Sequence, residues 1–98
     1  MSPSDVIAIL RRHQADLRDR GVRHAALFGS TARGENAPQS DIDILVEIDQ
    51  DRVRDVYDYT GLIAYIGDLF PVVVDVANRD ALTAHVREGA ERDAIHAF

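Results

Sequence analysis

The spacing of hydrophobic and polar residues changes several times along the chain. Residues 4–20 place apolar side chains at helical intervals with Arg and Asp between them, which predicts an amphipathic helix that ends at Gly21. Residues 24–28 (HAALF) are short and apolar, which is typical of a buried strand. Residues 41–48 (DIDILVEI) alternate, so we expect a strand with every second residue, from Ile42 onward, on one buried face.

The second half of the chain continues this exchange between helical and strand spacing. Apolar residues at helical intervals predict a helix over residues 51–69, which ends before Pro71. Residues 72–77 (VVVDVA) are mostly β-branched, so we expect a third strand in the centre of a sheet. Residues 78–96 are expected to be mostly helical, with a break at Gly89. The resulting order predicts an α/β (α+β) protein whose small mixed β-sheet is flanked by helices.

Length and composition limit the classes of protein that fit. The 98 residues predict one domain, spanning residues 1–98. The net charge of −6 argues against direct contact with nucleic acid, because phosphate binding requires clustered Lys and Arg. The chain has no cysteine and therefore no thiolate metal site, and we expect a cytoplasmic protein. No apolar run approaches the ~18 residues of a membrane-spanning helix, so no membrane partner is expected.

A polar loop separates the first two predicted strands. It covers residues 29–40, with a helical turn near Thr31 and a turn at Pro38. Gly29 lets the backbone approach a ligand closely, and Ser30 with the N–H groups that follow can hold phosphate oxygens. An ordinary turn capped by Ser30 is the alternative.

Two aspartates stand at the head of the second predicted strand. Asp41 and Asp43 are two positions apart, so both carboxylates point to the same face of a strand. Two like charges at this spacing repel each other unless a cation lies between them, and Mg²⁺ favours carboxylate oxygens. The alternative is that both side chains face water at the start of the strand.

A third acidic residue, Asp75, lies inside the apolar run that predicts the third strand. A charge in a buried strand is costly unless it is paired or bound to a metal. An ion pair with Arg79, the nearest cation in the sequence, is one explanation. If the two strands are neighbours, the three carboxylates instead resemble a site that holds two metal ions for phosphoryl or nucleotidyl transfer.

The combination of Gly29-Ser30, Asp41-x-Asp43 and the later Asp75 resembles the DNA polymerase beta-like nucleotidyltransferase superfamily. The stretch FGSTARGENAPQSDIDILV is particularly similar to the minimal nucleotidyltransferase (MNT) antitoxins. The similarity extends from the first helix through the third strand. The short chain agrees with the minimal forms, which lack the additional helical domain of their larger relatives.

The resemblance implies roles for the residues of the motif. It assigns the triphosphate of ATP to Gly29 and Ser30, with Arg33 as a further phosphate contact for which a surface arginine is the alternative. It assigns two Mg²⁺ ions and catalysis to Asp41, Asp43 and Asp75. Among these, Asp75 would bind the catalytic ion and help to activate the attacking hydroxyl.

The resemblance also implies a partner and a reaction. The partner would be a HEPN-domain toxin, and AMP would pass from ATP to a tyrosine hydroxyl of that toxin. One alternative is a non-catalytic antitoxin that neutralises the toxin by binding, with a vestigial or regulatory nucleotide site. Another is a nucleotidyltransferase that modifies a small molecule. Assembly as a homodimer or a hetero-oligomer stays open, since a second chain could complete a small cleft.

Overall fold

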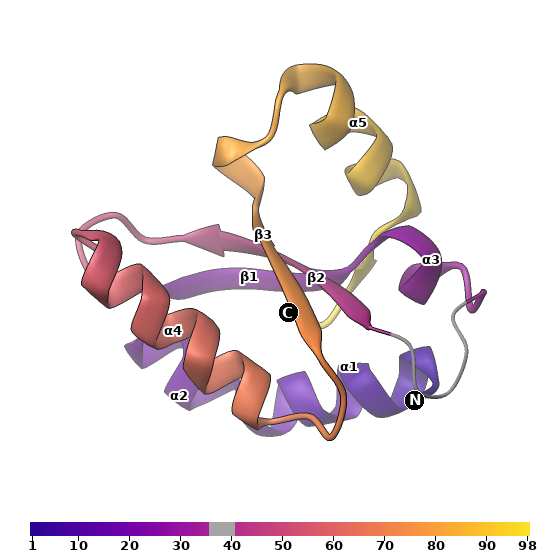
Figure 1. Ribbon diagram of the computed structural model, residues 1–98, viewed down its shortest axis with the longest axis horizontal. Coiled ribbons are helices and arrows are strands. Elements are labelled where there is room, and N and C mark those ends of the chain that lie inside the picture. Colours follow the sequence, from indigo (N-terminus) through magenta and orange to yellow (C-terminus); the bar gives the residue numbers. More distant parts are fainter. Residues whose placement is uncertain (36–40) are drawn as a thin grey trace.

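Helices and strands alternate along most of the chain (Figure 1). The structure is a computed structural model that describes residues 1–35 and 41–98. The turn expected at Pro38 lies outside the described residues. The elements are α1 (Pro3–Arg12), α2 (Gln14–Asp19), β1 (Val22–Leu27), α3 (Gly29–Ala32), β2 (Ile42–Ile48), α4 (Val56–Asp68), β3 (Val74–Asn78), the 3₁₀ helix η1 (Arg79–Ala81), α5 (Ala84–Asp93) and β4 (Ile95–His96).

The four strands form one mixed sheet in the order β3-β2-β1-β4. β1 pairs antiparallel with both β2 and β4, whereas β2 pairs parallel with β3. A parallel pair needs a crossover connection, and α4 supplies it. Figure 1 shows α1, α2 and α4 on one side of the sheet and α5 on the other. The predicted fold class, a small mixed sheet flanked by helices, is confirmed.

Strand β2 divides the interior of the protein from the face that carries the acidic motif. Ile42, Ile44, Val46 and Ile48 are buried in the core, as the alternation predicts. Asp43 and the other intervening residues of β2 point to the opposite face of the sheet. The core face packs against apolar residues of the first two helices and of α4.

The first predicted helix is two helices. The side chain of Ser2 accepts a hydrogen bond from the Asp5 N–H, and Asp5 completes a capping box, so α1 begins at Pro3. His13 leaves helical geometry and separates α1 from α2. Both helices keep apolar residues on the core side, which explains why hydrophobic spacing alone predicted one continuous helix.

The predicted start of α4 was too early. Asp55 caps this helix by accepting a hydrogen bond of 2.8 Å from the Asp58 N–H. Upstream, the Asp51 N–H donates a hydrogen bond to the side chain of Asp49, and residues 50–52 form a turn instead of the first turn of the helix. Aspartate side chains compete for backbone N–H groups in this way, and they favour caps and turns over helix interiors.

The expectation of a central third strand was wrong, because β3 is an edge strand. Val73, just before it, is 65% exposed, and Asp75 is exposed rather than buried. A run of β-branched residues predicts a strand, but it does not by itself distinguish a central strand from an edge strand. Asp75 is therefore not a buried charge, and the predicted cost of burying it does not apply.

The end of the chain also differs from the prediction of a mostly helical segment. The side chain of Asn78 caps η1, and α5 begins after Thr83 and continues through Gly89 without a break. The chain then returns to the sheet as β4, and the Ala97 N–H donates to the carbonyl of Ala25 at 2.9 Å. A strand of two residues is too short to produce a hydrophobic pattern.

Within residues 1–35 and 41–98, no helix combines the length and apolar character that crossing a bilayer requires.

Because β2 lies in the core, the same type of substitution should cost more stability in β2 than in the short strand β4. Ile44→Val removes a methylene group from a fully buried side chain, whereas Ile95→Val removes it from a side chain that is 40% exposed. We expect Ile44→Val to lower the free energy of unfolding by about 0.5–1.5 kcal/mol and Ile95→Val to lower it by less than about 0.5 kcal/mol. Urea denaturation measures both values. Equal losses would contradict the assignment of β2 to the core.

Candidate active site

The Gly-Ser turn brings backbone directly against the acidic motif. Strand β1 ends at Leu27, and α3 begins at Gly29 with a positive φ of 62°. A Cβ atom at Gly29 would lie 3.1 Å from Oδ2 of Asp43. Glycine is therefore required here for two reasons, the backbone conformation and the close carboxylate.

Thr31 fixes the position of Asp43. It is the one fully buried polar residue in the described part of the chain. Its hydroxyl accepts a hydrogen bond of 3.0 Å from the Asp43 N–H and lies 3.5 Å from Oδ2 of the same residue. This role was not predicted from the sequence, although a hydroxyl residue in the helical turn beside the Gly-Ser pair was an available signal.

The parallel pairing of β2 with β3 places Asp43 opposite Asp75. Burial raises the pKa of the Asp43 carboxyl above its ordinary value of 3.8, and the charges of Asp75 and Asp41 raise it further. The Thr31 hydroxyl and the Arg33 guanidinium act in the opposite direction. The protein therefore holds together carboxylates that repel one another, which is the condition that a bound cation relieves.

The three aspartates lie near one another without forming a closed cage. In the part of the chain that the structure describes, no group of three His, Asp or Glu side chains is close enough to hold one metal ion. Asp41 is exposed and Asp43 is half-buried. Mg²⁺ commonly takes one or two protein carboxylates and completes its shell with water and phosphate oxygens. The donors present fit that ion, provided that a phosphate ligand shares it.

Arg33 lies at the end of α3 and forms ion pairs rather than standing free. It contacts Glu35 and Asp93, each at 3.1 Å. The second of these pairs links α3 to α5. Exposed ion pairs of this kind contribute little to stability, so a phosphate group can compete for the guanidinium.

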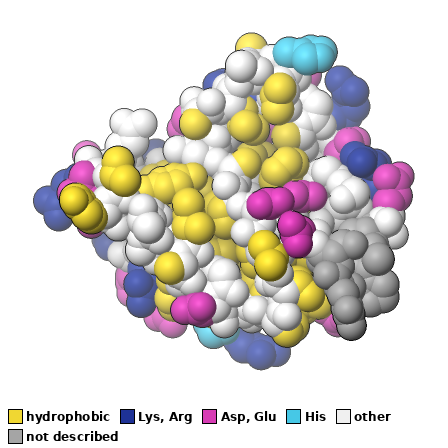
Figure 2. All heavy atoms as spheres, viewed as in Figure 1, with side chains coloured by type: hydrophobic (Ala, Val, Ile, Leu, Met, Phe, Trp, Pro, Cys, Tyr) yellow, Lys and Arg dark blue, Asp and Glu magenta, His cyan; other side chains and the backbone are white. Residues whose placement is uncertain are grey.

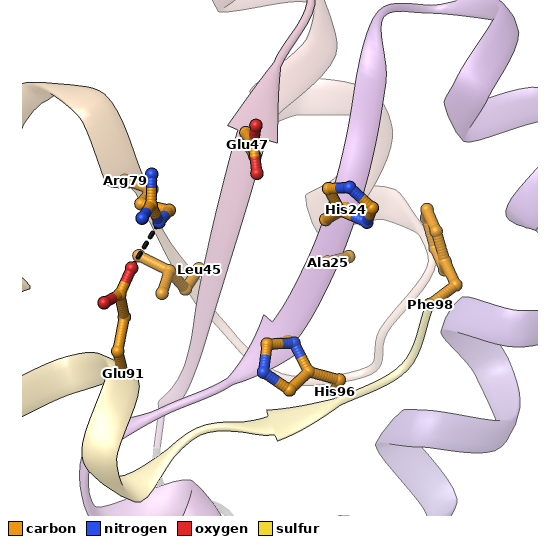
Figure 3. A pocket seen from close by; sticks show the side chains of 9 residues that line it. His24, Ala25, Leu45, Glu47, Arg79, Glu91, His96 and Phe98 are labelled. Atoms are coloured by element: carbon orange, nitrogen blue, oxygen red, sulfur yellow. Dashed lines mark hydrogen bonds and ion pairs between the residues drawn. The ribbon is translucent and has the colours of Figure 1, made fainter.

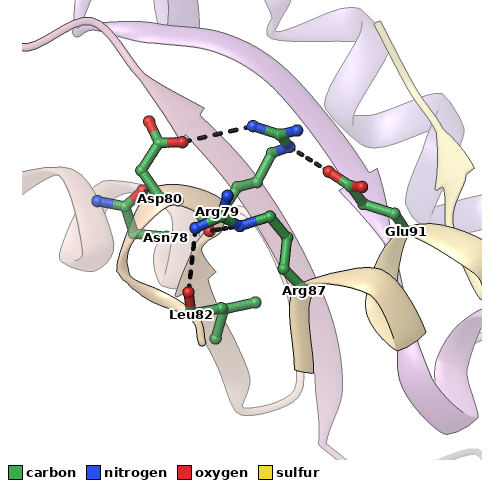
Figure 4. A network of polar contacts seen from close by, with 6 residues as sticks. All are labelled: Asn78, Arg79, Asp80, Leu82, Arg87 and Glu91. Carbon is green, nitrogen blue, oxygen red and sulfur yellow. Dashed lines mark hydrogen bonds and ion pairs between the residues drawn. The ribbon is translucent and has the colours of Figure 1, made fainter. Parts of the chain in front are cut away.

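Arg79 does not neutralise Asp75, although it is the nearest cation in the sequence. It pairs with Glu91 of α5 and with Asp80 (Figure 4). Arg87 supports the same region by donating to the backbone carbonyls of Arg79 and Leu82. Among residues 1–35 and 41–98, no ion pair includes Asp75.

A cavity of about 690 Å³ opens on the sheet face that carries Asp43 (Figure 3). Its floor includes Leu45 and Ala26, and Glu47 and the Arg79–Glu91 pair lie at its side. None of the three aspartates lines it. Leu45 follows Asp43 by two positions on β2, so a ligand held at Asp43 can extend along the strand into this cavity.

Acidic side chains gather on the exposed surface near β2 and β3, beside a strip of hydrophobic side chains between α4 and α5 (Figure 2). The three aspartates of the motif thus belong to an accessible face of the molecule, because Asp41 and Asp75 are exposed.

The fold and the sequence identify the class of protein as a nucleotidyltransferase. A family model described as a nucleotidyltransferase domain matches residues 10–96. The chain belongs to this family. The resemblance inferred from the Gly-Ser and Asp-x-Asp motifs is confirmed.

Similar proteins cover nearly the whole chain. A Methanocaldococcus jannaschii protein named "Putative protein adenylyltransferase" is 37% identical over an alignment of 95 residues, and the match covers 95% of this chain and 95% of that protein. "Protein adenylyltransferase MntA" of Thermococcus cleftensis is 30% identical over 93 residues, covering 94% of this chain and 92% of MntA.

Solved structures agree with the fold. A structure described as "putative minimal nucleotidyltransferase" superposes with a TM-score of 0.80 at 29% identity, covering 97% of this chain and 95% of the other. A chain from a toxin–antitoxin structure with AMP-PNP has a TM-score of 0.69 at 20% identity, covering 90% of this chain and 72% of the other. At that identity the second likeness concerns the fold alone.

Two glycines with positive φ provide a matched test of the contact between the turn and Asp43. Gly29→Ala and Gly34→Ala both impose a strained backbone, but only the first adds a Cβ near the carboxylate, because a Cβ at Gly34 meets nothing within 4 Å. Each should lower the free energy of unfolding by about 1–2 kcal/mol through the strain. Only Gly29→Ala should also weaken stabilisation by Mg²⁺ with an ATP analogue in thermal melts. If Mg²⁺ with the ATP analogue stabilised both variants equally weakly, the proposed contact between the Gly29 turn and the Asp43 site would be contradicted.

Substitutions at Thr31 test its hold on Asp43. Thr31→Val leaves the Asp43 N–H without its partner and should lower the free energy of unfolding by about 1–3 kcal/mol. Thr31→Ser keeps the hydroxyl and loses a methyl group, so its cost should be about 1 kcal/mol. Carbon NMR of the Asp43 carboxyl should show a higher pKa in Thr31→Val alone, since the Thr31 hydroxyl lowers that pKa. An unchanged pKa would show that the hydroxyl does not act on the carboxylate.

Proposed function

We propose that this protein is the antitoxin of a HEPN/MNT toxin–antitoxin pair and that it inactivates the toxin by adenylylation. Its reaction is the Mg²⁺-dependent transfer of AMP from ATP to a tyrosine hydroxyl of the toxin. The observation that carries the proposal is the register of β2 and β3, which pairs Asp43 with Asp75 beside the close-approach glycine Gly29.

The residues of the site divide into two groups by chemistry. Asp41, Asp43 and Asp75 would hold two Mg²⁺ ions. When bound, such ions neutralise charge on the phosphates and lower the pKa of an attacking hydroxyl. Gly29 and Ser30 hold the triphosphate through the backbone and the serine hydroxyl, and Arg33 exchanges an acidic partner for phosphate.

The transfer forms one bond and breaks another. The acceptor oxygen attacks the α-phosphorus of ATP, and the bond from that phosphorus to the oxygen bridging the β-phosphate breaks. Pyrophosphate leaves, and a phosphodiester joins AMP to the acceptor. The hydroxyl proton passes to solvent by way of the exposed Asp75 carboxylate. The protein contributes to catalysis mainly by positioning the reactants and by stabilising charge.

Two kinds of support favour a protein as the acceptor. Several similar proteins, two of which reach 37% and 30% identity, carry names that describe them as protein adenylyltransferases. The described residues also include no separate domain that would enclose a small acceptor. The tyrosine and the HEPN toxin follow from the motif resemblance, and the acidic surface suits a protein partner better than free RNA.

One observation favours a second candidate, an antitoxin that acts by binding alone. The side chains of the three aspartates do not converge into a metal-holding group in the described part of the chain. In that case the nucleotide site would be vestigial or regulatory, and the repulsion around Asp43 would have no catalytic purpose.

The experiment combines the protein, ATP labelled on its α-phosphate, Mg²⁺ and the toxin encoded beside it. We expect covalent label on a tyrosine of the toxin, identified by mass spectrometry. Asp41→Asn with Asp43→Asn should lower the labelling rate by at least about 10³-fold, since it removes most of the proposed metal ligands.

A matched control separates loss of the site from loss of charge. Asp16→Asn with Asp19→Asn removes the same two charges from α2, away from the site, and should label normally. Normal labelling by the Asp41 and Asp43 double variant would refute the proposed catalytic site, because transfer would then not depend on these two carboxylates. The binding-only antitoxin would be supported if the wild-type protein forms a stable complex with the toxin without labelling it and the double variant still rescues growth.

A further inference from the structure

The outer edge of β3 has unused backbone hydrogen-bonding groups. β3 is the first strand in the sheet order, with β2 on one side only. The Ile42 N–H donates to the carbonyl of Val73 at 3.0 Å, which sets the phase of the parallel ladder. Asp75 and Ala77 therefore face β2, and the N–H and C=O groups of Val74 and Val76 face outward. No hydrogen bond to those outward groups occurs among residues 1–35 and 41–98.

The surface beside this edge is partly apolar and accessible. Val73 is 65% exposed, and Val74 and Val76 are half-buried. Figure 2 shows hydrophobic side chains between α4 and α5, next to the acidic group. Proteins usually protect a free edge strand, since its backbone groups pair readily with another extended chain. This edge is therefore suited to strand addition.

Strand addition here would place an acceptor correctly for the proposed transfer. Adjacent strands lie about 4.7–4.9 Å apart, and paired residues share a face. A residue paired beside Asp75 would thus project onto the face that carries Asp43. Across the sheet the order becomes acceptor, Asp75, Asp43 and then the turn at Gly29. The hydroxyl approaches from the β3 side, and pyrophosphate departs toward α3, as in-line displacement requires.

Charge indicates which kind of chain occupies the edge. The edge carries Asp75 and lies beside Asp41 and Asp43, in a protein of net charge −6. Pairing the β3 edges of two copies would bring these carboxylates toward their equivalents, and like charges on paired strands are destabilising. A segment with Lys or Arg on the same face as its hydroxyl is attracted instead.

We propose that the outer edge of β3 binds the acceptor by strand addition, and that the acceptor is an extended, basic, hydroxyl-bearing segment of the protein substrate. This inference rests on the proposed function, and it assigns substrate recognition to backbone pairing at Val74 and Val76. Specificity then comes from the alternate side chains of the added strand.

The first test uses a synthetic peptide of alternating residues, Lys-Val-Lys-Val-Tyr-Val-Lys-Val-Lys, with a fluorescent label. In an added strand its tyrosine and lysines share one face. Two further peptides each carry two N-methyl groups. In one peptide the methyl groups replace N–H groups that face β3, and in the other they replace N–H groups of the intervening residues, which face away from β3. We expect one methylated peptide to bind about 25-fold more weakly, or about fivefold for each lost hydrogen bond, and the other to bind normally.

The second test changes the protein instead of the peptide. Val76→Pro removes one outward N–H without removing a hydrogen bond to β2, and edge strands tolerate proline. Val76→Thr keeps the N–H and the β-branched shape. We expect peptide affinity to fall about fivefold or more in Val76→Pro and to be retained in Val76→Thr. Both variants should keep their thermal stabilisation by Mg²⁺ with an ATP analogue, because Val76 packs against the core on the face opposite Asp75 and a residue before proline keeps its extended conformation.

Several outcomes would overturn the proposal. Equal effects of the two methylation patterns would show that the peptide does not pair as a strand. Equal affinity for a peptide with Glu in place of Lys would remove the basis for a basic segment. Absence of peptide binding would also overturn it, and a wild-type dimer that dissociates in Val76→Pro would then assign the edge to a second copy.

The two proposals fail in different ways. If Mg²⁺ and the ATP analogue do not stabilise the wild-type protein, the transferase function fails, even if the peptide still binds in one methylation pattern. If the nucleotide stabilises the protein and label reaches the toxin, but the methylation patterns act equally, only the strand-addition proposal fails.

Discussion

The parallel pairing of β2 with β3 governs how the sheet, its crossover helix and the acidic residues are arranged. It brings Asp43 and Asp75 together on an open sheet face, although a helix separates their strands in the sequence. Pairing of this kind requires a crossover, and α4 provides it while covering the opposite face. The same layer of packing that builds the core therefore also sets the distance between the two carboxylates.

A small number of local contacts keeps the acidic face in place against its own repulsion. The buried Thr31 hydroxyl binds the Asp43 backbone, and Gly29 leaves room for its carboxylate. Arg33 and Arg79 connect α5 to α3 and to η1 through exposed ion pairs with Asp93 and Glu91. Arg33 also stands close enough to Asp43 to lower the pKa of its carboxyl.

The edge position of β3 changes the interpretation of the third aspartate. A buried Asp75 would need a counter-charge within the protein, whereas the exposed Asp75 is available to ligands from outside. An open edge also leaves space on that side of the carboxylate. In the proposed reaction, the acceptor strand would supply the remaining wall of the site, because the described residues include no additional domain.

Local patterns were sufficient for β2 and for the helical turn near Thr31, because alternation and glycine act over a few neighbouring positions. Paired carboxylates beside a glycine likewise predicted the candidate site residues, whose roles stay a prediction. They could not locate β3 at the edge, detect the two residues of β4 or reveal the clamp from Thr31 to Asp43. Those features depend on which segments meet in space. The chemical groups and most of the local elements can thus be read from the chain. Which groups face one another and which edge stays open cannot, since strand order and register arise from packing between distant segments.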